Sequence, residues 1–242
     1  MAILMIEDKI EKALNSFKLP EQWGVNYYDD DTSEEVECAS YCVGKAVHGY
    51  VTNGITKAVI IIPNSEYVVK IPFNGYFDCT SEYNEETKEY EEGERYFTHF
   101  ENANDLGEDY AECWDYCENE RIKYNNAVDA GFGEFFPETR YYREKDGFPV
   151  YLQEKCKTYS FHSCTPSEEA TEKSRSNKKL RCQADSRWVA AAVDYYGEER
   201  VEKFITYLNE NNLGYDLHDG NLGFGKKGNP IILDFSGYRE GA

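Results

Sequence analysis

Three oxygen-bearing side chains near the C-terminal end of the sequence have the types and spacing of a metal and phosphate site. Asp216 and Asn221 lie five positions apart, and Asp234 follows the short apolar run at residues 231–233. Carboxylate and amide oxygens are ligands that suit Mg²⁺. Phosphoryl transfer needs one carboxylate to orient the attacking hydroxyl, and further oxygen ligands to hold metal ions against the nucleotide phosphates. The spacing therefore predicts a magnesium and phosphate site within residues 214–236.

A lysine lies in the middle of a predicted strand far upstream of this segment. Residues 57–63 and 67–73 are two runs rich in β-branched side chains, separated by a short polar turn, and they predict a β-hairpin. Lys70 occupies the second run. On a strand this lysine either faces solvent or points into a cleft, and the residues alone leave both interpretations open.

A glutamate on a predicted helix offers a partner for that lysine. Residues 113–131 read as a helix that ends at Gly131. Helical spacing places Glu120 on the same stripe as Cys117 and Tyr124, and a carboxylate on an apolar stripe needs a cationic partner or suffers a large desolvation cost. Lys70 is the candidate partner. The alternative is that Glu120 lies at the edge of the stripe and faces water.

Taken together, these segments resemble the protein kinase-like superfamily. Asp216-Leu-His-Asp-Gly-Asn221 resembles its catalytic loop in the form found in aminoglycoside phosphotransferases. The Asp-Phe-Ser that begins at Asp234 resembles the Asp-Phe-Gly motif, and the Val-Val-Lys-Ile string around Lys70 resembles the lysine strand. The resemblance implies that Asp216 orients the acceptor hydroxyl, while Asn221 and Asp234 hold magnesium. It also implies that Lys70 binds the nucleotide phosphates and that Glu120 holds Lys70 in place.

The same resemblance implies contacts to ATP from two further segments. Gly54 and Thr56 precede the strand that pairs with the lysine strand, and they are the preferred turn over the phosphates. The alternatives are Gly49, in the glycine-containing stretch 44–51, and a purely structural turn at either glycine. Glu154 and Cys156 resemble the hinge segment that holds adenine through backbone groups.

The implied fold class is α+β, a two-lobed kinase-like fold with an antiparallel-sheet small lobe and a reduced helical large lobe. We expect an N-terminal helix and acidic linker at 1–39, a small lobe at 40–153 and a large lobe at 154–242. An acidic insertion at 74–112 interrupts the small lobe, and its residues 85–99 predict a helix. Further helices are predicted at 113–131, from 188 onward and at 198–211. The large lobe is expected to be reduced because only eight residues follow Asp234.

Composition excludes several classes of partner. The chain has 26 Lys and Arg against 46 Asp and Glu, a formal net charge of −20, which repels a phosphate backbone or an anionic membrane. We therefore expect neither nucleic acid nor membrane as a partner. The absence of an export signal and of a long apolar run predicts a soluble, cytoplasmic protein. The eight cysteines are then expected to be free thiols, with zinc binding by Cys38, Cys42, Cys113 and Cys117 as the alternative.

The predicted function is an ATP- and magnesium-dependent phosphotransferase that moves the γ-phosphoryl group to a hydroxyl of a protein or a small molecule. The alternative is a pseudokinase, a nucleotide-binding interaction module that acts on a protein partner without catalysis. Asp216 favours catalysis, because a binding module does not need it. A third interpretation is an accidental loop resemblance in an unrelated α+β protein. A basic patch at 173–181 either folds back on acidic surface or meets an anionic partner.

Overall fold

The computed structural model describes residues 2–26, 43, 49–54, 56–84, 86–100, 115–214 and 217–234. The chain divides into two compact units. The first comprises Met1–Cys117 with Tyr141–Leu152, and the second comprises Glu118–Arg140 with Gln153–Ala242. Helices and antiparallel sheets together make the protein α+β, as predicted.

A five-stranded sheet forms the centre of the first unit. Its strands run in the order β2-β3-β4-β8-β7, with bounds Tyr50–Asn53, Lys57–Ile61, Tyr67–Pro72, Phe148–Glu154 and Thr139–Lys145. The ends of β7 and β8 that join the second unit are counted with it. Asn64 turns the β3–β4 hairpin with φ 56°, and Asp146 and Gly147 turn β7 into β8 with φ 51° and 86°. The hairpin predicted at residues 57–63 and 67–73 is confirmed.

The two faces of this sheet differ in chemistry. Ala58, Ile60, Val69 and Ile71 alternate along β3 and β4, and they belong to the buried apolar cluster. That cluster also contains Trp23 and side chains of the N-terminal helix α1 (Ala2–Asn15). Successive side chains of a strand point to opposite faces. The intervening positions of β3 and β4 therefore face away from the core.

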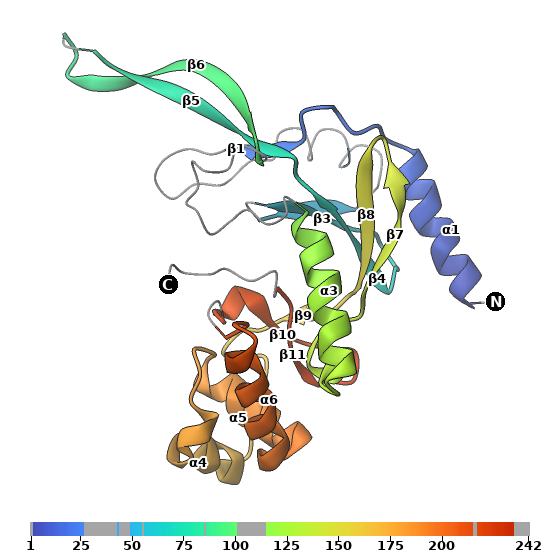
Figure 1. Ribbon diagram of the computed structural model, residues 1–242, viewed down its shortest axis with the longest axis vertical. Helices are drawn as coiled ribbons and strands as arrows, with labels where there is room; N and C mark the ends of the chain where they lie inside the picture. Colours follow the sequence, from blue (N-terminus) through green and yellow to red (C-terminus); the bar gives the residue numbers. More distant parts are fainter. Residues whose placement is uncertain are drawn as a thin grey trace. The chain divides into compact units, whose positions relative to one another are not determined.

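A second sheet of three strands belongs to the same unit. β1 (Gly24–Asn26) pairs in parallel with the base of β5 (Gly75–Asn84), and β5 pairs with β6 (Glu89–His99). Figure 1 shows β5 and β6 continuing beyond β1 as a long two-stranded ribbon. The prediction of a helix at 85–99 is wrong. Cross-strand pairing outweighs the helix-favouring glutamates, as where Phe77 lies opposite Phe97 with ring centroids 4.8 Å apart.

The second unit is mainly helical. Its helices are α3 (Tyr116–Asp129), whose first two residues are counted with the first unit, α4 (Glu168–Ser176), α5 (Ser186–Tyr196) and α6 (Glu198–Glu210). Single 3₁₀ turns lie at Gly133–Phe135, Lys178–Leu180 and Asp219–Asn221. A small sheet has the order β11-β10-β9, with bounds Pro230–Ile232, Leu222–Phe224 and Lys157–Thr158. α3, α5 and α6 confirm the predicted helices, whereas α4 was not predicted. No helix among the described residues is long and apolar enough to cross a membrane.

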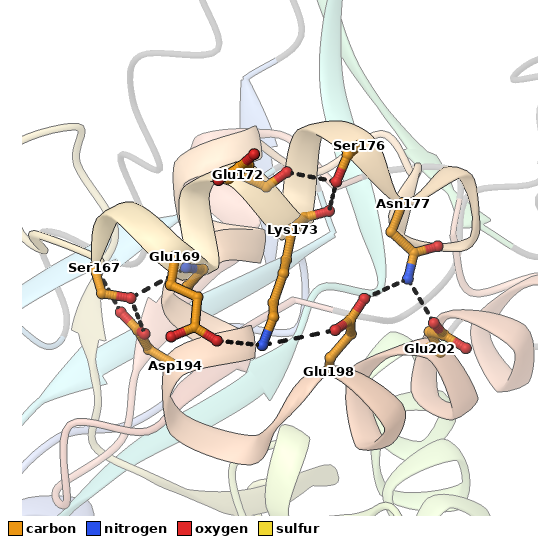
Figure 2. A network of polar contacts seen from close by, with 10 residues as sticks. Ser167, Glu169, Glu172, Lys173, Ser176, Asn177, Asp194, Glu198 and Glu202 are labelled. Atoms are coloured by element: carbon orange, nitrogen blue, oxygen red, sulfur yellow. Dashed lines mark hydrogen bonds and ion pairs between the residues drawn. The ribbon is translucent and has the colours of Figure 1, made fainter.

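Polar contacts fix α4 against its neighbours (Figure 2). The Lys173 ammonium lies 2.7 Å from a Glu169 carboxylate oxygen and 3.8 Å from one of Glu198. The Asn177 amide donates to Glu198 and to Glu202 at 2.7 and 2.5 Å. Lys173 in the basic patch therefore folds back on acidic side chains of its own unit, which agrees with the first of the two interpretations of that patch.

Candidate functional site

Two of the predicted magnesium ligands lie at the same end of one hairpin. β10 and β11 pair with Leu222 opposite Ile232, and the Leu233 amide donates to the Asn221 carbonyl at 2.7 Å. The pairing thus extends to the last residue before Asp234. Asn221 is 9 % exposed, and Asp234 is half-buried. The hairpin therefore brings an amide and a carboxylate thirteen positions apart in sequence to neighbouring places.

The loop that leads into this hairpin is braced by a histidine. His218 Nδ1 accepts a hydrogen bond from the Gly220 amide at 3.1 Å, and its carbonyl accepts one from the Asn221 amide at 2.9 Å. His218 therefore braces the backbone of this turn. Asp219 is exposed in the same turn. Asp216, the predicted catalytic carboxylate, lies outside the described residues.

The hairpin is held in place by side chains and a strand from elsewhere in the second unit. β9 pairs with β10, and the Tyr159 amide donates to the Leu222 carbonyl at 2.8 Å. The Trp188 indole donates to the Gly223 carbonyl at 3.3 Å. A β-carbon at Gly223 would lie 2.5 Å from the Lys157 carbonyl oxygen, so this position accepts only glycine without a shift of the backbone.

Two tyrosines connect the hairpin to α5. The Tyr196 hydroxyl lies 2.8 Å from the Glu134 carbonyl and 3.1 Å from the carbonyl of Pro230, the first residue of β11. The Tyr159 hydroxyl donates at 2.7 Å to Asp185, which also accepts the Arg187 amide at 2.8 Å and caps α5. The positions of Asn221 and Asp234 therefore depend on contacts from β9, Tyr159 and α5.

These contacts shift the pKa values of Tyr159 and Asp185. Burial and the hydrogen bond to Asp185 raise the pKa of Tyr159. Burial alone would raise the pKa of Asp185, but the hydrogen bonds from Tyr159 and from the Arg187 and Trp188 amides outweigh it, so that pKa lies below its usual value. Asp185 is therefore a charged acceptor at neutral pH, and Tyr159 is a neutral donor.

Lys70 lies in β4 of the first unit, directly opposite Val59 on β3. Its side chain is only 4 % exposed. The solvent-facing interpretation of this lysine is therefore wrong. Burial of an ammonium group requires anionic or polar partners, as expected for a residue with a binding role.

Glu120 is fully buried on α3. It accepts a hydrogen bond at 3.3 Å from the Gln153 amide, which also donates to the Thr139 hydroxyl at 3.1 Å. The alternative in which Glu120 faces water is therefore excluded. Its ion pair with Lys70, which belongs to the other unit, stays a prediction.

Gly54 and Thr56 form the connection between β2 and β3. The Gly54 amide donates to the Lys57 carbonyl at 3.2 Å, and the Thr56 carbonyl accepts from the Phe73 amide at 2.9 Å. Among the described residues, no atom lies within 4 Å of the place where a β-carbon would stand on Gly54, so their packing does not require glycine there.

Of the predicted hinge residues, Glu154 is the last residue of β8 and Cys156 directly precedes β9. The Glu154 amide donates to the Glu138 carbonyl at 2.8 Å, and its carbonyl accepts from the Cys156 thiol at 3.3 Å. Lys226 lies 3.7 Å from the Glu154 carboxylate. The Glu154 amide is therefore already bonded within the chain.

The donor set around the hairpin suits a hard cation. Asn221 and Asp234 supply oxygen ligands, which fit Mg²⁺ better than a soft transition metal. The described part of the chain contains no group of three His, Cys, Asp or Glu that could hold a metal. Of the four cysteines in the zinc alternative, Cys117 is buried and forms no disulfide, and the others lie outside the described residues.

A surface depression of about 430 Å³ lies along α4 and contains none of the predicted site residues. It is lined by Pro166, Glu168, Thr171, Glu172, Arg175 and Ser176.

The supporting residues Trp188, Tyr159, Tyr196 and Asp185 were not predicted from the sequence, because nothing in their spacing connects them to the hairpin. No protein-family model matches the chain, and no curated protein matches it.

Proposed function

We propose that this chain is a kinase-like phosphotransferase that uses ATP and magnesium and transfers the γ-phosphoryl group to a hydroxyl of a protein or a small molecule. The observation that carries the proposal is the β10–β11 hairpin. It places Asn221 and Asp234 at one end, joined by the 2.7 Å bond between the Leu233 amide and the Asn221 carbonyl. Paired oxygen ligands of this kind are what phosphoryl transfer needs to hold its metal.

The buried cation of the first unit supports the same proposal. Lys70 is an ammonium group at 4 % exposure in a chain with a net charge of −20. In the proposed reaction this lysine binds the phosphates of the nucleotide, and Glu120 orients it. Gly54 contributes its backbone to the phosphate contacts.

The reaction itself needs few chemical groups from the protein. Asp216 orients the acceptor hydroxyl and accepts its proton as the oxygen attacks the γ-phosphorus, while the bond from that phosphorus to the bridging oxygen breaks and ADP leaves. Asn221 and Asp234 would hold magnesium, which would neutralise charge on the phosphate oxygens. The protein's remaining task is to hold these groups in position, and Trp188, Tyr159 and Tyr196 do so for the hairpin.

The test combines binding with turnover. Saturating ATP with magnesium should raise the melting temperature of the wild-type protein by several degrees, because a ligand that binds only the folded state stabilises it. Release of phosphate from ATP, with and without added hydroxyl acceptors, should depend on magnesium. Asp216→Asn should bind ATP normally and lose at least about a hundredfold in turnover, as does removal of other electrostatic catalytic groups.

Asp219→Asn is the matched control, because it makes the same chemical change on an exposed residue of the same loop. Its turnover should equal that of the wild type. Stabilisation by ATP with no turnover under any condition would instead support a nucleotide-binding interaction module. If neither ATP nor magnesium changed the melting temperature, both kinase-like interpretations would fail.

A further inference from the structure

The ribbon formed by β5 and β6 continues well beyond β1, the third strand of its sheet (Figure 1). β5 has 10 residues and β6 has 11, whereas β1 pairs only with the first three residues of β5. No described side chain of residues 77–99 belongs to a buried apolar cluster. Such a pair of strands is only marginally stable in water unless a third strand or a packed face supports it.

Contacts within the ribbon give it a defined shape. At its tip, the Asn84 side-chain oxygen accepts hydrogen bonds from the Glu86 and Thr87 amides at 2.9 and 3.2 Å. Along the strands, the Tyr96 hydroxyl lies 3.2 Å from an Asp78 carboxylate oxygen. The ribbon is therefore a preformed element rather than an irregular loop.

The outer edge of the ribbon can accept a further strand. The strand order β1-β5-β6 makes β6 an outer strand, so no described strand pairs with its second edge. Such an edge presents main-chain N–H and C=O groups, to which an extended segment of another protein can add. Tyr96 on β6 is 47 % exposed, and tyrosine is enriched at protein interfaces. β6 therefore offers both main-chain groups and an aromatic side chain to a partner.

The charge of the ribbon determines which partner fits. Residues 75–99 contain eight Asp and Glu against two Lys and Arg. Acidic residues on an edge strand disfavour pairing with a second copy of the same strand, and they repel nucleic acid and anionic membranes. They attract a segment rich in Lys or Arg, because opposite charges on neighbouring strands stabilise their pairing.

We propose that the outer edge of β6 is a docking surface for a protein partner, which adds an extended segment rich in Lys or Arg as a further strand of the β1-β5-β6 sheet. The partner supplies a third strand for the part of the ribbon beyond Phe77, and its basic side chains offset the repulsion among the acidic ones. The inference goes beyond the proposed function, since none of the residues assigned to ATP, magnesium or the acceptor lies on the ribbon.

The first test measures binding of a probe peptide by fluorescence anisotropy at low salt. The probe alternates Lys and Val over about ten residues, the length of a long strand. It should bind the wild type, whereas a peptide of alternating Glu and Val should not. A Lys–Val peptide with N-methyl groups on alternate residues keeps its charge but loses main-chain donors, and it should bind at least about tenfold more weakly.

Charge reversal locates the docking surface on the ribbon. Glu86 and Glu94 are both exposed, and Glu86→Lys combined with Glu94→Lys should weaken binding of the Lys–Val peptide at least about fivefold, because two attractions become repulsions. The matched control combines Asp8→Lys with Glu210→Lys, which makes the same change of net charge at exposed positions of α1 and α6. Its affinity should stay within about twofold of that of the wild type.

A shortened ribbon provides the strongest variant. Cys79 lies opposite Arg95, so Asn-Gly in place of residues 80–94 closes a tight turn and keeps the base of the ribbon. This variant should lose binding of the Lys–Val peptide; if it does not fold, the charge-reversed variant decides. Equal affinity in the wild type and the charge-reversed variant, or equal binding of the methylated and unmethylated peptides, would overturn the inference. Dimerisation of the wild type through the ribbon would also overturn it, because a second copy would then be the partner.

Discussion

The two hairpins that carry predicted site residues are built in different ways. The β3–β4 hairpin, with Lys70, lies inside a five-stranded sheet, and its alternate side chains enter a large apolar core. The β10–β11 hairpin, with Asn221 and Asp234 at its end, has only three residues in each strand. Its position depends on β9 and on single hydrogen bonds from Trp188 and Tyr196.

The difference shows how the polar side chains of each hairpin are positioned. Lys70 is placed by strand alternation, a local rule that neighbouring strands enforce along the whole sheet. Asn221 and Asp234 are placed by packing against residues that lie far away in the sequence. Mutations around the β10–β11 hairpin should therefore affect the stability of the protein, whereas mutation of Lys70 should affect ATP turnover.

The largest expected effect follows from removal of Trp188. Trp188→Ala deletes a buried ring and the hydrogen bond to Gly223, so the free energy of unfolding should fall by about 3–5 kcal/mol. Trp188→Phe keeps most of the ring and should cost about 1–3 kcal/mol, the penalty for a buried carbonyl left without its donor. Urea denaturation measures both. A loss below about 1 kcal/mol for Trp188→Ala would show that Trp188 does not hold the hairpin, because loss of a buried large side chain ordinarily costs more.

Mutation of Lys70 in the β3–β4 hairpin should act mainly on ATP turnover. Lys70→Met should reduce ATP turnover by at least about a hundredfold, because it removes a charge that stabilises the transferring phosphoryl group. Lys12→Met, on the exposed surface of α1, is the control for the change in net charge. An unchanged rate in Lys70→Met would remove this lysine from the site.

The smallest expected effect is on the pH dependence of the second unit's stability. The pKa of Asp185 is below its ordinary value of 3.8, so its contribution to stability is present above that pH and is lost as the pH falls further. The pKa of Tyr159 is raised above 10.0, so its contribution is present below that pH and is lost as the pH rises beyond it.

Tyr159→Phe removes the bond between these two groups and should cost about 1 kcal/mol at neutral pH. It should also flatten the loss of stability above pH 10.0, which thermal melts across the pH range would detect. If Tyr159→Phe lost as much stability above pH 10.0 as the wild type does, another group would be the cause of that loss.

The sequence predicted the parts of the fold that depend on local patterns. Runs rich in β-branched residues located β3 and β4, and Gly131, with φ 81°, correctly marked the end of α3. Within the helix predicted at residues 85–99, the chain forms strand β6 instead. Gly93 lies within that stretch and close to Thr80 of β5. Glycine disfavours a helix.

The candidate site was less predictable than the fold. Spacing alone identified Asn221 and Asp234, and the β10–β11 hairpin brings them to one end. The support from Trp188, Tyr159 and Tyr196 depends on long-range packing, which no local pattern encodes. α4 could have been found, because Ser167 followed by Glu168 and Glu169 is a typical helix start, and the Ser167 hydroxyl does accept the Ala170 amide.

The most direct test of the phosphotransferase proposal is the magnesium-dependent release of phosphate from ATP by the wild-type protein, compared with Asp216→Asn. The proposal predicts turnover in the wild type that chelation of magnesium abolishes, and a loss of at least about a hundredfold in the variant despite normal ATP binding. Equal turnover in the two proteins, or no effect of ATP and magnesium on either of them, would contradict it.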